Sequence, residues 1–295
     1  MTQTDIRDDV ASAGAPVAPG TMIAGRYRVL EQLERYGVPA GYRVRHTLLD
    51  SVLVLTALPP QRTKEAGFLA RVQAVVRQAG QLRHDHLLPV LDLVEDGERY
   101  FLVEPFVDAV PLDHMVRDQP LAPPDALLVA RQLADALAYA HEHGVVHGAV
   151  SPANVWIERG RPPRALLGGF GHAALAWNAS AGLPASLPYT APERIVGAEV
   201  DVCTDIFTIG LLVFELFEGR ALLSGTAREV EALLRGTGPL VPRFSGLVPA
   251  GVSALVGRAV RRTPGARQQK MAHVRVEIDA CLRAVGQAPG AAAAP

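Results

Sequence analysis

Residues 147–155, HGAVSPANV, decide the fold. They follow a stretch, residues 123–144, that begins with Pro-Pro-Asp, carries one apolar face and stops at Gly144, and these features predict a helix. A short strand-loop-strand unit is predicted from about residue 146 to 170, so HGAVSPANV lies in its first half. We interpret the segment as a loop that comes directly after a helix.

The sequence has two different patterns on the two sides of this loop. From Tyr27 to Phe106 the apolar residues favour strands, interrupted by one helical stretch at residues 65–83. After Pro105 the pattern becomes mostly helical, with later helices predicted near residues 205–219, 227–235, 250–262 and 270–284. The predicted fold class is α+β, with a small strand-rich lobe followed by a larger helical lobe.

The two ends of the chain differ in composition from the part between them. Residues 1–23 and 286–295 are rich in small residues and proline and have no apolar period, so both are predicted to be flexible tails. The folded domain is then expected at residues 24–285, divided into 24–105 and 106–285.

Composition excludes several classes of protein. The 295 residues carry 29 basic and 30 acidic side chains, so a net charge of −1 gives no reason to expect nucleic acid or an anionic membrane as a partner. Two cysteines, Cys203 and Cys281, are too few for a disulfide scaffold and are interpreted as buried or incidental thiols. Lys64 and Lys270 are the only lysines, which leaves few candidates for a catalytic lysine.

The sequence also bears on location. The N-terminus lacks the basic start and apolar core of a signal peptide. The strongest apolar run, Ile206 to Phe217, is shorter than the ~20 residues that cross a bilayer. We therefore expect a cytoplasmic protein without a membrane span, and a buried helix at this run.

Between about residues 25 and 285, the chain resembles the eukaryotic-like serine/threonine protein kinases of bacteria. The landmarks occur in family order: the loop at 147–155, Phe170-Gly171 of the metal-loop triplet, Ala191-Pro192-Glu193 at the end of the activation segment, and the helix start at Thr204–Gly210. The resemblance implies a two-lobed fold with an antiparallel sheet and one helix in the smaller lobe.

The chain departs from this family at the positions that do its chemistry. Phosphate transfer requires a positioned nucleotide, metal-neutralised phosphates and an oriented hydroxyl. The resemblance places the phosphate-binding lysine at Thr56 and its glutamate partner at Val75. It places the catalytic base at Ala149, the lysine of the catalytic loop at Ser151 and the metal-binding aspartate at Gly169, so none of the five positions has the expected group. The arginine before the base is replaced by Gly148. The resemblance thus indicates a degenerate member, a pseudokinase.

The nucleotide cleft is altered as well. Of the glycines in the phosphate-covering loop only Gly37 remains, and Glu34 would repel a triphosphate. The resemblance places the following residues in a vestigial cleft: Gly37, Gly41, Val54, Glu104, Asn154 and Trp156. Our hypothesis is that Trp156 and Val54 fill the adenine space; the alternative is that Trp156 is an ordinary core residue turned elsewhere. Asn154 alone cannot hold Mg²⁺, so no metal is expected.

A second group of residues is retained, and the resemblance gives it structural roles. His147 orders the catalytic loop, Asp205 accepts backbone N–H bonds from that loop, and Glu193 pairs with Arg267 to brace the end of the activation segment. Phe170 completes this structural group: His147, Phe170, Glu193, Asp205 and Arg267.

Several hydroxyl groups are candidate modification sites. Ser180, Ser186, Tyr189 and Thr190 lie between Gly169 and Glu193, where we expect a folded, solvated loop, because Gly148 removes the arginine that grips a phosphate there. Thr2 and Thr4 precede acidic residues and weakly resemble acceptor sites that forkhead-associated domains bind.

The leading functional prediction is an inactive protein that acts as a scaffold or as an allosteric partner in signalling. Its expected partner is a protein, either an active kinase or a signalling or envelope-assembly protein. No cofactor is expected, although weak ATP binding without magnesium stays open. The alternative is an atypical active serine/threonine kinase, for which Lys64 or Lys270 and improvised acids such as Glu34 or Glu158 would have to reach the cleft. A third hypothesis is a small-molecule phosphotransferase, because the loop at 147–155 also resembles the corresponding loop of aminoglycoside and choline kinases.

Overall fold

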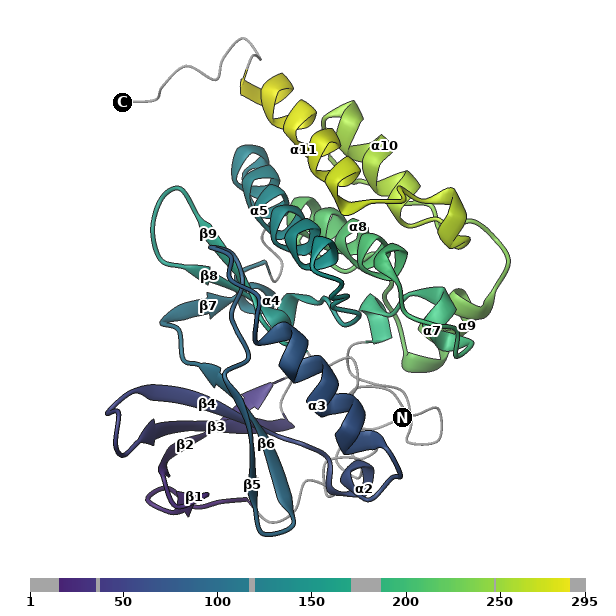
Figure 1. Ribbon diagram of the computed structural model, residues 1–295. Coiled ribbons are helices and arrows are strands. Elements are labelled where there is room, and N and C mark those ends of the chain that lie inside the picture. Colours follow the sequence, from purple (N-terminus) through teal and green to yellow (C-terminus); the bar gives the residue numbers. More distant parts are fainter. Residues whose placement is uncertain (1–15, 36–37, 117–119, 171–186, 247, 287–295) are drawn as a thin grey trace. The chain divides into compact units, whose positions relative to one another are not determined.

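Alternating apolar residues between Tyr27 and Pro105 form an antiparallel sheet, and the more continuously apolar chain after it forms helices (Figure 1). This computed structural model describes residues 16–35, 38–116, 120–170, 187–246 and 248–286. The described residues form two compact units. The first contains those up to Arg83, Leu88–Asp108, and Gly169 with Phe170; the second contains the rest. The main division thus falls at Asp108, close to the predicted boundary at residue 105.

The first unit is built on a six-stranded sheet in the order β1-β2-β3-β4-β6-β5, with every pairing antiparallel. The strand bounds are β1 Met22–Ile23, β2 Tyr27–Arg35, β3 Val38–His46, β4 Val52–Ala57, β5 Asp92–Asp96 and β6 Arg99–Pro105. One face of the sheet buries an apolar cluster that includes Val44, Leu55 and Phe101. This sheet confirms the predicted antiparallel lobe.

Two helices accompany the sheet, α2 at Pro60–Thr63 and α3 at Phe68–Ala79. The sequence predicted one helix from residue 65, but Gly67 adopts a left-handed φ of 75° and the helix begins after it. Phe68, Val72 and Ala79 are buried along one face of α3, at the predicted helical spacing.

Part of the predicted N-terminal tail is ordered. Residues 16–23 lie in the first unit, where Met22–Ile23 forms strand β1 against β2 and Ile23 is buried. The Gly20 N–H also donates to the Val29 carbonyl. The composition of this segment suggested a tail, but pairing with an existing strand supplies the hydrogen bonds that composition does not reveal.

The second unit is centred on α8, Val202–Glu218, whose residues Cys203–Phe217 are all buried. A helix that is apolar on all sides must be covered on all sides. Helices α5 (Pro123–Glu142) and α10 (Ala250–Ala259) pack on α8, and α11 (Met271–Gly286) packs on α5 and α10 (Figure 1). The start of α8 is fixed by a capping box in which Asp201 and Thr204 satisfy each other's backbone N–H groups.

A second sheet in this unit has the order β7-β8-β9, from Ala109–Pro111, Val155–Glu158 and Arg164–Leu167. The predicted strand-loop-strand unit therefore begins later than expected, because residues 152–154 form a 3-10 turn, η2, instead. The remaining short elements of the unit are α4 (Leu112–Met115), η3 (Leu187–Tyr189), α7 (Pro192–Ile195), α9 (Ala227–Arg235) and η4 (Pro264–Ala266).

Close helix packing explains one glycine of α8. A Cβ atom added to Gly210 would lie 2.7 Å from the Ala259 Cβ and 3.0 Å from the Val260 Cγ1, so only glycine lets the end of α10 approach α8 this closely. Among the described helices, none has both the length and the apolar content needed to cross a bilayer.

Candidate functional site

The loop at residues 147–155 is anchored by Asp205, which lies in the first turn of α8 and is completely buried. Its carboxylate accepts the N–H of His147 at 2.9 Å and the N–H of Gly148 at 2.7 Å. It also contacts the His141 Nε2 at 2.8 Å. A buried carboxylate is tolerated when donors surround it in this way, so Asp205 fixes the start of the loop.

His147 extends this anchoring to the strand side of the loop. Its Nδ1 accepts the N–H of Ala149 at 3.2 Å, which leaves Nε2 to donate to the carbonyl of Gly168 at 2.8 Å. The imidazole is buried. These two bonds fix the backbone at Ala149 and Gly168.

Gly148 is held at both of its backbone groups. Asp205 accepts its N–H, and the Arg194 guanidinium donates to its carbonyl. Its φ of 68° is the left-handed conformation that glycine adopts without strain. Arg194 is itself buried, and burial lowers its pKa while Asp205 and Glu193 oppose that shift. Sequence reasoning missed this arginine, because no motif connects residue 194 to residue 148.

The other loop positions have no acid or lysine. Ala149 is half-buried and Ser151 is buried, and neither side chain can act as a base at neutral pH. Asn154 is buried in η2 and its Nδ2 donates to the Ala149 carbonyl at 2.8 Å, so its amide helps to close the loop.

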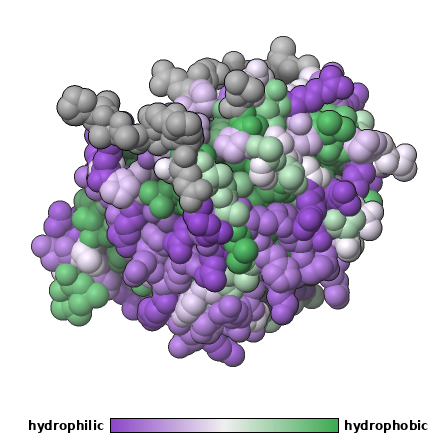
Figure 2. Space-filling model, turned by 90° about the horizontal axis from the view of Figure 1, so that it is seen from above, coloured by the Kyte–Doolittle hydropathy of each residue, from purple (hydrophilic) through white to green (hydrophobic). Residues whose placement is uncertain are grey.

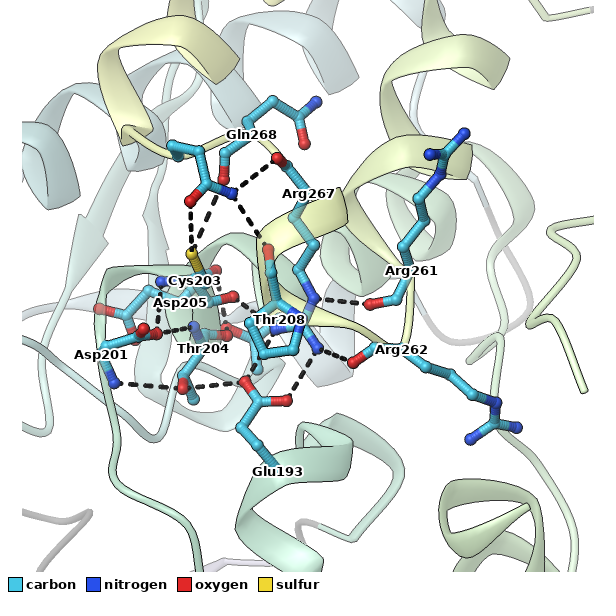
Figure 3. A network of polar contacts seen from close by, with 12 residues as sticks. Glu193, Asp201, Cys203, Thr204, Asp205, Thr208, Arg261, Arg262, Arg267 and Gln268 are labelled. Carbon is cyan, nitrogen blue, oxygen red and sulfur yellow. Dashed lines mark hydrogen bonds and ion pairs between the residues drawn. The ribbon is translucent and has the colours of Figure 1, made fainter. Parts of the chain in front are cut away.

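The end of the activation segment is joined to α8 by a network of polar contacts (Figure 3). Arg267 donates from Nη1 and Nη2 to the two carboxylate oxygens of Glu193, both at 2.8 Å. Its Nε donates to the carbonyl of Arg261, and Nη1 and Nη2 also donate to those of Cys203 and Arg262. Burial would raise the pKa of Glu193, but Arg267 holds that pKa below its usual value. All five guanidinium N–H donors of Arg267 are used, which makes this pair a rigid brace.

In the first unit, three of the predicted site residues meet. Thr56 on β4 donates its hydroxyl to the Glu104 Oε2 at 3.4 Å, and the Gly169 N–H donates to the Glu104 Oε1 at 3.2 Å. Glu104 lies on β6 and is 7% exposed. Gly169 has a φ of 80°, again a conformation suited to glycine. The sequence had placed these residues in the site without connecting them.

The remaining candidates lie apart from this cluster or outside the described residues. Val75 is half-buried on α3. Lys64 is exposed, with its Nζ 4.0 Å from the Glu98 carboxylate, and Lys270 is exposed as well. Glu158 pairs with Arg164 at 2.9 Å near the surface. The described side chains do not include Glu34 or Gly37, nor Ser180, Ser186, Thr2 and Thr4.

Three cleft residues have a structural explanation. A Cβ on Gly41 would lie 2.4 Å from the Leu55 carbonyl oxygen, so the β3–β4 pairing requires glycine there. Val54 pairs with Glu104 between β4 and β6, and Trp156 pairs with Pro111 and Leu166 in the three-stranded sheet. Val54 and Trp156 are both half-buried, and they belong to different units. The adenine-filling hypothesis therefore stays a prediction.

A buried carboxylate that no sequence motif indicated lies next to the end of the activation segment. Glu215 on α8 accepts the Tyr189 hydroxyl at 2.7 Å. Burial raises the pKa of Glu215 to about 6; the hydrogen bond from Tyr189 opposes the shift and the nearby Asp113 adds to it. The hydroxyl of Tyr189, a candidate phosphorylation site, is thus bound to Glu215.

Comparison with known proteins identifies the family. Residues 55–238 match the family model described as a protein kinase domain. The chain belongs to the protein kinase family. PrkC of Bacillus subtilis, named a serine/threonine-protein kinase, is 25% identical over 264 residues, which cover 88% of this chain and 41% of PrkC. PknD of Mycobacterium tuberculosis, which carries the same designation, is 29% identical over 253 residues, 82% of this chain and 38% of PknD.

A solved protein kinase domain supports the fold assignment. The crystal structure of the PknI kinase domain of Mycobacterium tuberculosis superposes with a TM-score of 0.72 at 28% identity, covering 92% of this chain and all of that chain. The protein kinase fold predicted from the sequence is confirmed. The chain spans about two fifths of the length of the curated relatives PrkC and PknD.

Membership of this family implies Mg-ATP, so the residues can be tested against that group. Magnesium prefers carboxylate and phosphate oxygens, and the position of the family's metal-binding aspartate is Gly169, which supplies no carboxylate. In the part of the chain that the structure describes, no three His, Cys, Asp or Glu side chains gather closely enough to hold a metal ion. Asn154 has its amide N–H on the Ala149 carbonyl. The described residues therefore do not fit a magnesium site of the family type.

Proposed function

We propose that this protein kinase family member acts by binding another protein rather than by transferring phosphate. One observation carries the proposal: the backbone anchors of the catalytic loop are kept, while the side chains at the chemical positions are Thr56, Ala149 and Gly169. Asp205, His147 and Arg194 hold the loop in a defined conformation. Such an arrangement preserves a folded surface without a base, a phosphate-binding lysine or a metal-binding aspartate.

The size of the expected loss supports this proposal. Removing a single donor that stabilises a transition state costs on the order of 10²–10³ in rate. Effects within one catalytic unit are not additive, so the separate losses cannot simply be multiplied. Even one such factor would reduce a kinase that turns over at roughly 1–100 per second to a very slow enzyme.

The proposed partner is a protein, either an active kinase or a signalling or envelope-assembly protein. Hydrophilic residues predominate on the face shown in Figure 2, with hydrophobic residues in separate small groups. Leu48 and Leu49, in the turn between β3 and β4, are 85% and 69% exposed. Affinity capture from the native host would identify the partner.

A second candidate function is weak ATP-dependent serine/threonine kinase activity. It is favoured by the names of the relatives, since PrkC and PknD are both called serine/threonine-protein kinases. Asn154, which the sequence resemblance associates with metal, is also retained. For this function the acids and the lysine would have to come from other positions. Glu104 is one acid already beside Thr56 and Gly169.

Transfer of radiolabelled phosphate distinguishes the two functions. The purified chain is incubated with labelled ATP and either Mg²⁺ or Mn²⁺, with itself and a generic protein as acceptors. The variant Asn154→Ala is the matched blank, because it removes the one retained metal-side residue. Binding without transfer predicts equal, background labelling for both proteins. Labelling that Asn154→Ala abolishes would instead establish the kinase function.

The adenine-filling hypothesis has a separate test. If Val54 and Trp156 fill the adenine space, millimolar ATP leaves both the tryptophan emission and the melting temperature unchanged. A clear shift in either would contradict the hypothesis.

A further inference from the structure

Glu215 is a buried carboxylate with little to compensate its charge. It lies in the last turn of α8 and is 8% exposed, and among the described residues its hydrogen-bond donor is the Tyr189 hydroxyl, at 2.7 Å. Glu193, also buried, has the guanidinium of Arg267 beside it. The C-terminal end of a helix is the negative end of its dipole, so the position of Glu215 disfavours a negative charge as well.

The groups that act on this charge come from two short elements. They are Tyr189 from η3 and Asp113 from α4, and neither is basic. Helices α5 and α10 also pack on α8, but no described charged group of theirs is among those that act on Glu215. One hydroxyl therefore favours the carboxylate, whereas burial and a second acid favour the neutral carboxyl.

Asp113 supplies the second acid from the first turn of α4. Its Oδ1 is buried and has no hydrogen-bond partner in the part of the chain that the structure describes. Its charge raises the pKa of Glu215. A proton on Glu215 removes the repulsion between the two side chains, and loss of that proton restores it.

The two elements should respond differently to this change of charge. Helix α4 has four residues, Leu112–Met115, and η3 has three, Leu187–Tyr189, so neither has many hydrogen bonds of its own to resist local opening. A charged acceptor strengthens the bond from Tyr189, which holds η3. The same charge repels Asp113, which is part of α4. Loss of the proton therefore favours η3 and opposes α4.

We propose that the proton on Glu215 is a switch for α4: the neutral carboxyl lets α4 pack closely, and the carboxylate loosens α4 while η3 stays bound through Tyr189. Because the pKa of Glu215 is raised to about 6, α4 closes below that pH and loosens above it. Helix α4 packs on η2 of the catalytic loop, so that loop is the next part of the unit to be affected. The inference goes beyond the proposed function, since it depends on neither a nucleotide nor a partner.

The titration of Glu215 in the full chain tests the electrostatic half of the proposal. Carbon NMR of the protein labelled at its glutamate carboxyl groups measures the midpoint, and the signal of Glu215 is the one that Glu215→Gln lacks. Asp113→Asn removes the opposing acid and should lower the midpoint by at least about half a pH unit. Tyr189→Phe removes the bond that favours the carboxylate and should raise the midpoint by a similar amount.

Glu199→Gln, at an exposed position, is the control and should leave the midpoint in place. A midpoint near 4.5 in the unmodified chain overturns the proposal. It is overturned as well if either Asp113→Asn or Tyr189→Phe fails to move the midpoint in the expected direction.

Hydrogen exchange tests the movement of α4. The amide of Val116 donates to the Leu112 carbonyl and reports on α4, and the amide of Thr190 donates to the Leu187 carbonyl and reports on η3. Each is compared at one pH between the unmodified chain and Glu215→Gln, which cannot ionise, so the intrinsic pH dependence of exchange cancels. The ratio of the two rates at about pH 5 is the baseline.

At about pH 7.5 the Val116 amide should exchange at least about fivefold faster in the unmodified chain than in Glu215→Gln, relative to that baseline. The ratio for Thr190 should stay at its baseline. An unchanged ratio for Val116 overturns the switch. Equal acceleration of both amides overturns it too, because ionisation would then weaken the whole unit instead of α4.

Discussion

Arg267 and Glu193 form a two-point ion pair, in which Nη1 and Nη2 of the arginine each donate to a different carboxylate oxygen at 2.8 Å. The Arg267 side chain is completely buried, and its guanidinium lies 4.8 Å from the centre of the Phe207 ring. The Thr204 hydroxyl donates to the same carboxylate at 3.0 Å. This pair ties the helix that follows the activation segment to the last part of the chain.

Removing the Arg267 guanidinium should destabilise the folded protein. Arg267→Met leaves Glu193 buried without its cation, so we expect a loss of about 3–5 kcal/mol in the free energy of unfolding, measured by urea denaturation. The matched control is Arg258→Met, because Arg258 pairs with Glu277 at 3.0 Å near the surface and should cost at most about 1 kcal/mol. Equal losses in the two variants would show that the buried pair carries no special weight.

Asp205 should matter more to folding than its neighbour Asp201. Asp205→Ala deprives the N–H groups of His147 and Gly148, and the His141 ring, of their acceptor, so a loss of about 3 kcal/mol or more is expected. Asp201→Ala removes only the cap of α8 and should cost about 1 kcal/mol. Hydrogen exchange at residues 147–149 should accelerate in the first variant only, and the reverse order of losses would contradict this account.

Glu215 should make stability depend on pH. Its pKa rises from 4.5 to about 6 on folding, so the folded state binds the proton more tightly than the unfolded state. The stabilisation is full below pH 4.5 and is lost as the pH rises through about 6. The shift corresponds to roughly 2 kcal/mol. Glu215→Gln keeps an acceptor for Tyr189 and should remove this part of the pH dependence.

Urea denaturation of both proteins across that pH range measures the effect. As the pH rises, the free energy of unfolding of Glu215→Gln should increase by roughly 2 kcal/mol relative to that of the unmodified chain, because the variant never carries the buried charge. Glu199→Gln, at an exposed position, is the control and should follow the unmodified chain. Parallel curves for Glu215→Gln and the unmodified chain would rule out a raised pKa.

Two glycines in neighbouring helices should respond oppositely to alanine. Gly210→Ala places a Cβ 2.7 Å from the Ala259 Cβ, so overpacking should cost about 1–3 kcal/mol despite the better helix propensity of alanine. Gly257→Ala, in α10, has no atom within 4 Å of the new Cβ and should stabilise by up to about 1 kcal/mol. Thermal unfolding of both variants tests the prediction, which fails if Gly210→Ala is neutral or stabilising.

The elements that the sequence predicted best are those with a long, uniform pattern. Helix α9 begins and ends at the predicted residues 227 and 235, where a capping box of Thr226 and Glu229 marks its start. Strand β5 was missed, because Asp92–Asp96 is short and acidic and its conformation comes from pairing with β6. Strand β1 was missed because it has only two residues, Met22–Ile23, and its conformation comes from pairing with β2.

The candidate site divides in a similar way. Positions fixed by motifs, such as Asp205 and His147, could be found from spacing along the chain. The bonds of Glu104 to Thr56 and Gly169, and of Arg194 to Gly148, could not, because each joins residues far apart in the sequence that carry no shared motif. A charged residue within an apolar strand, as at Glu104, was the one signal available.

Helix α7 is only four residues long, and two adjacent residues in it bind in different directions. Glu193 engages Arg267, while Arg194 engages Gly148 in the catalytic loop. A force applied to this short helix therefore reaches both places at once. Displacing α7 would therefore strain the loop at Gly148 and the buried ion pair at Arg267 together.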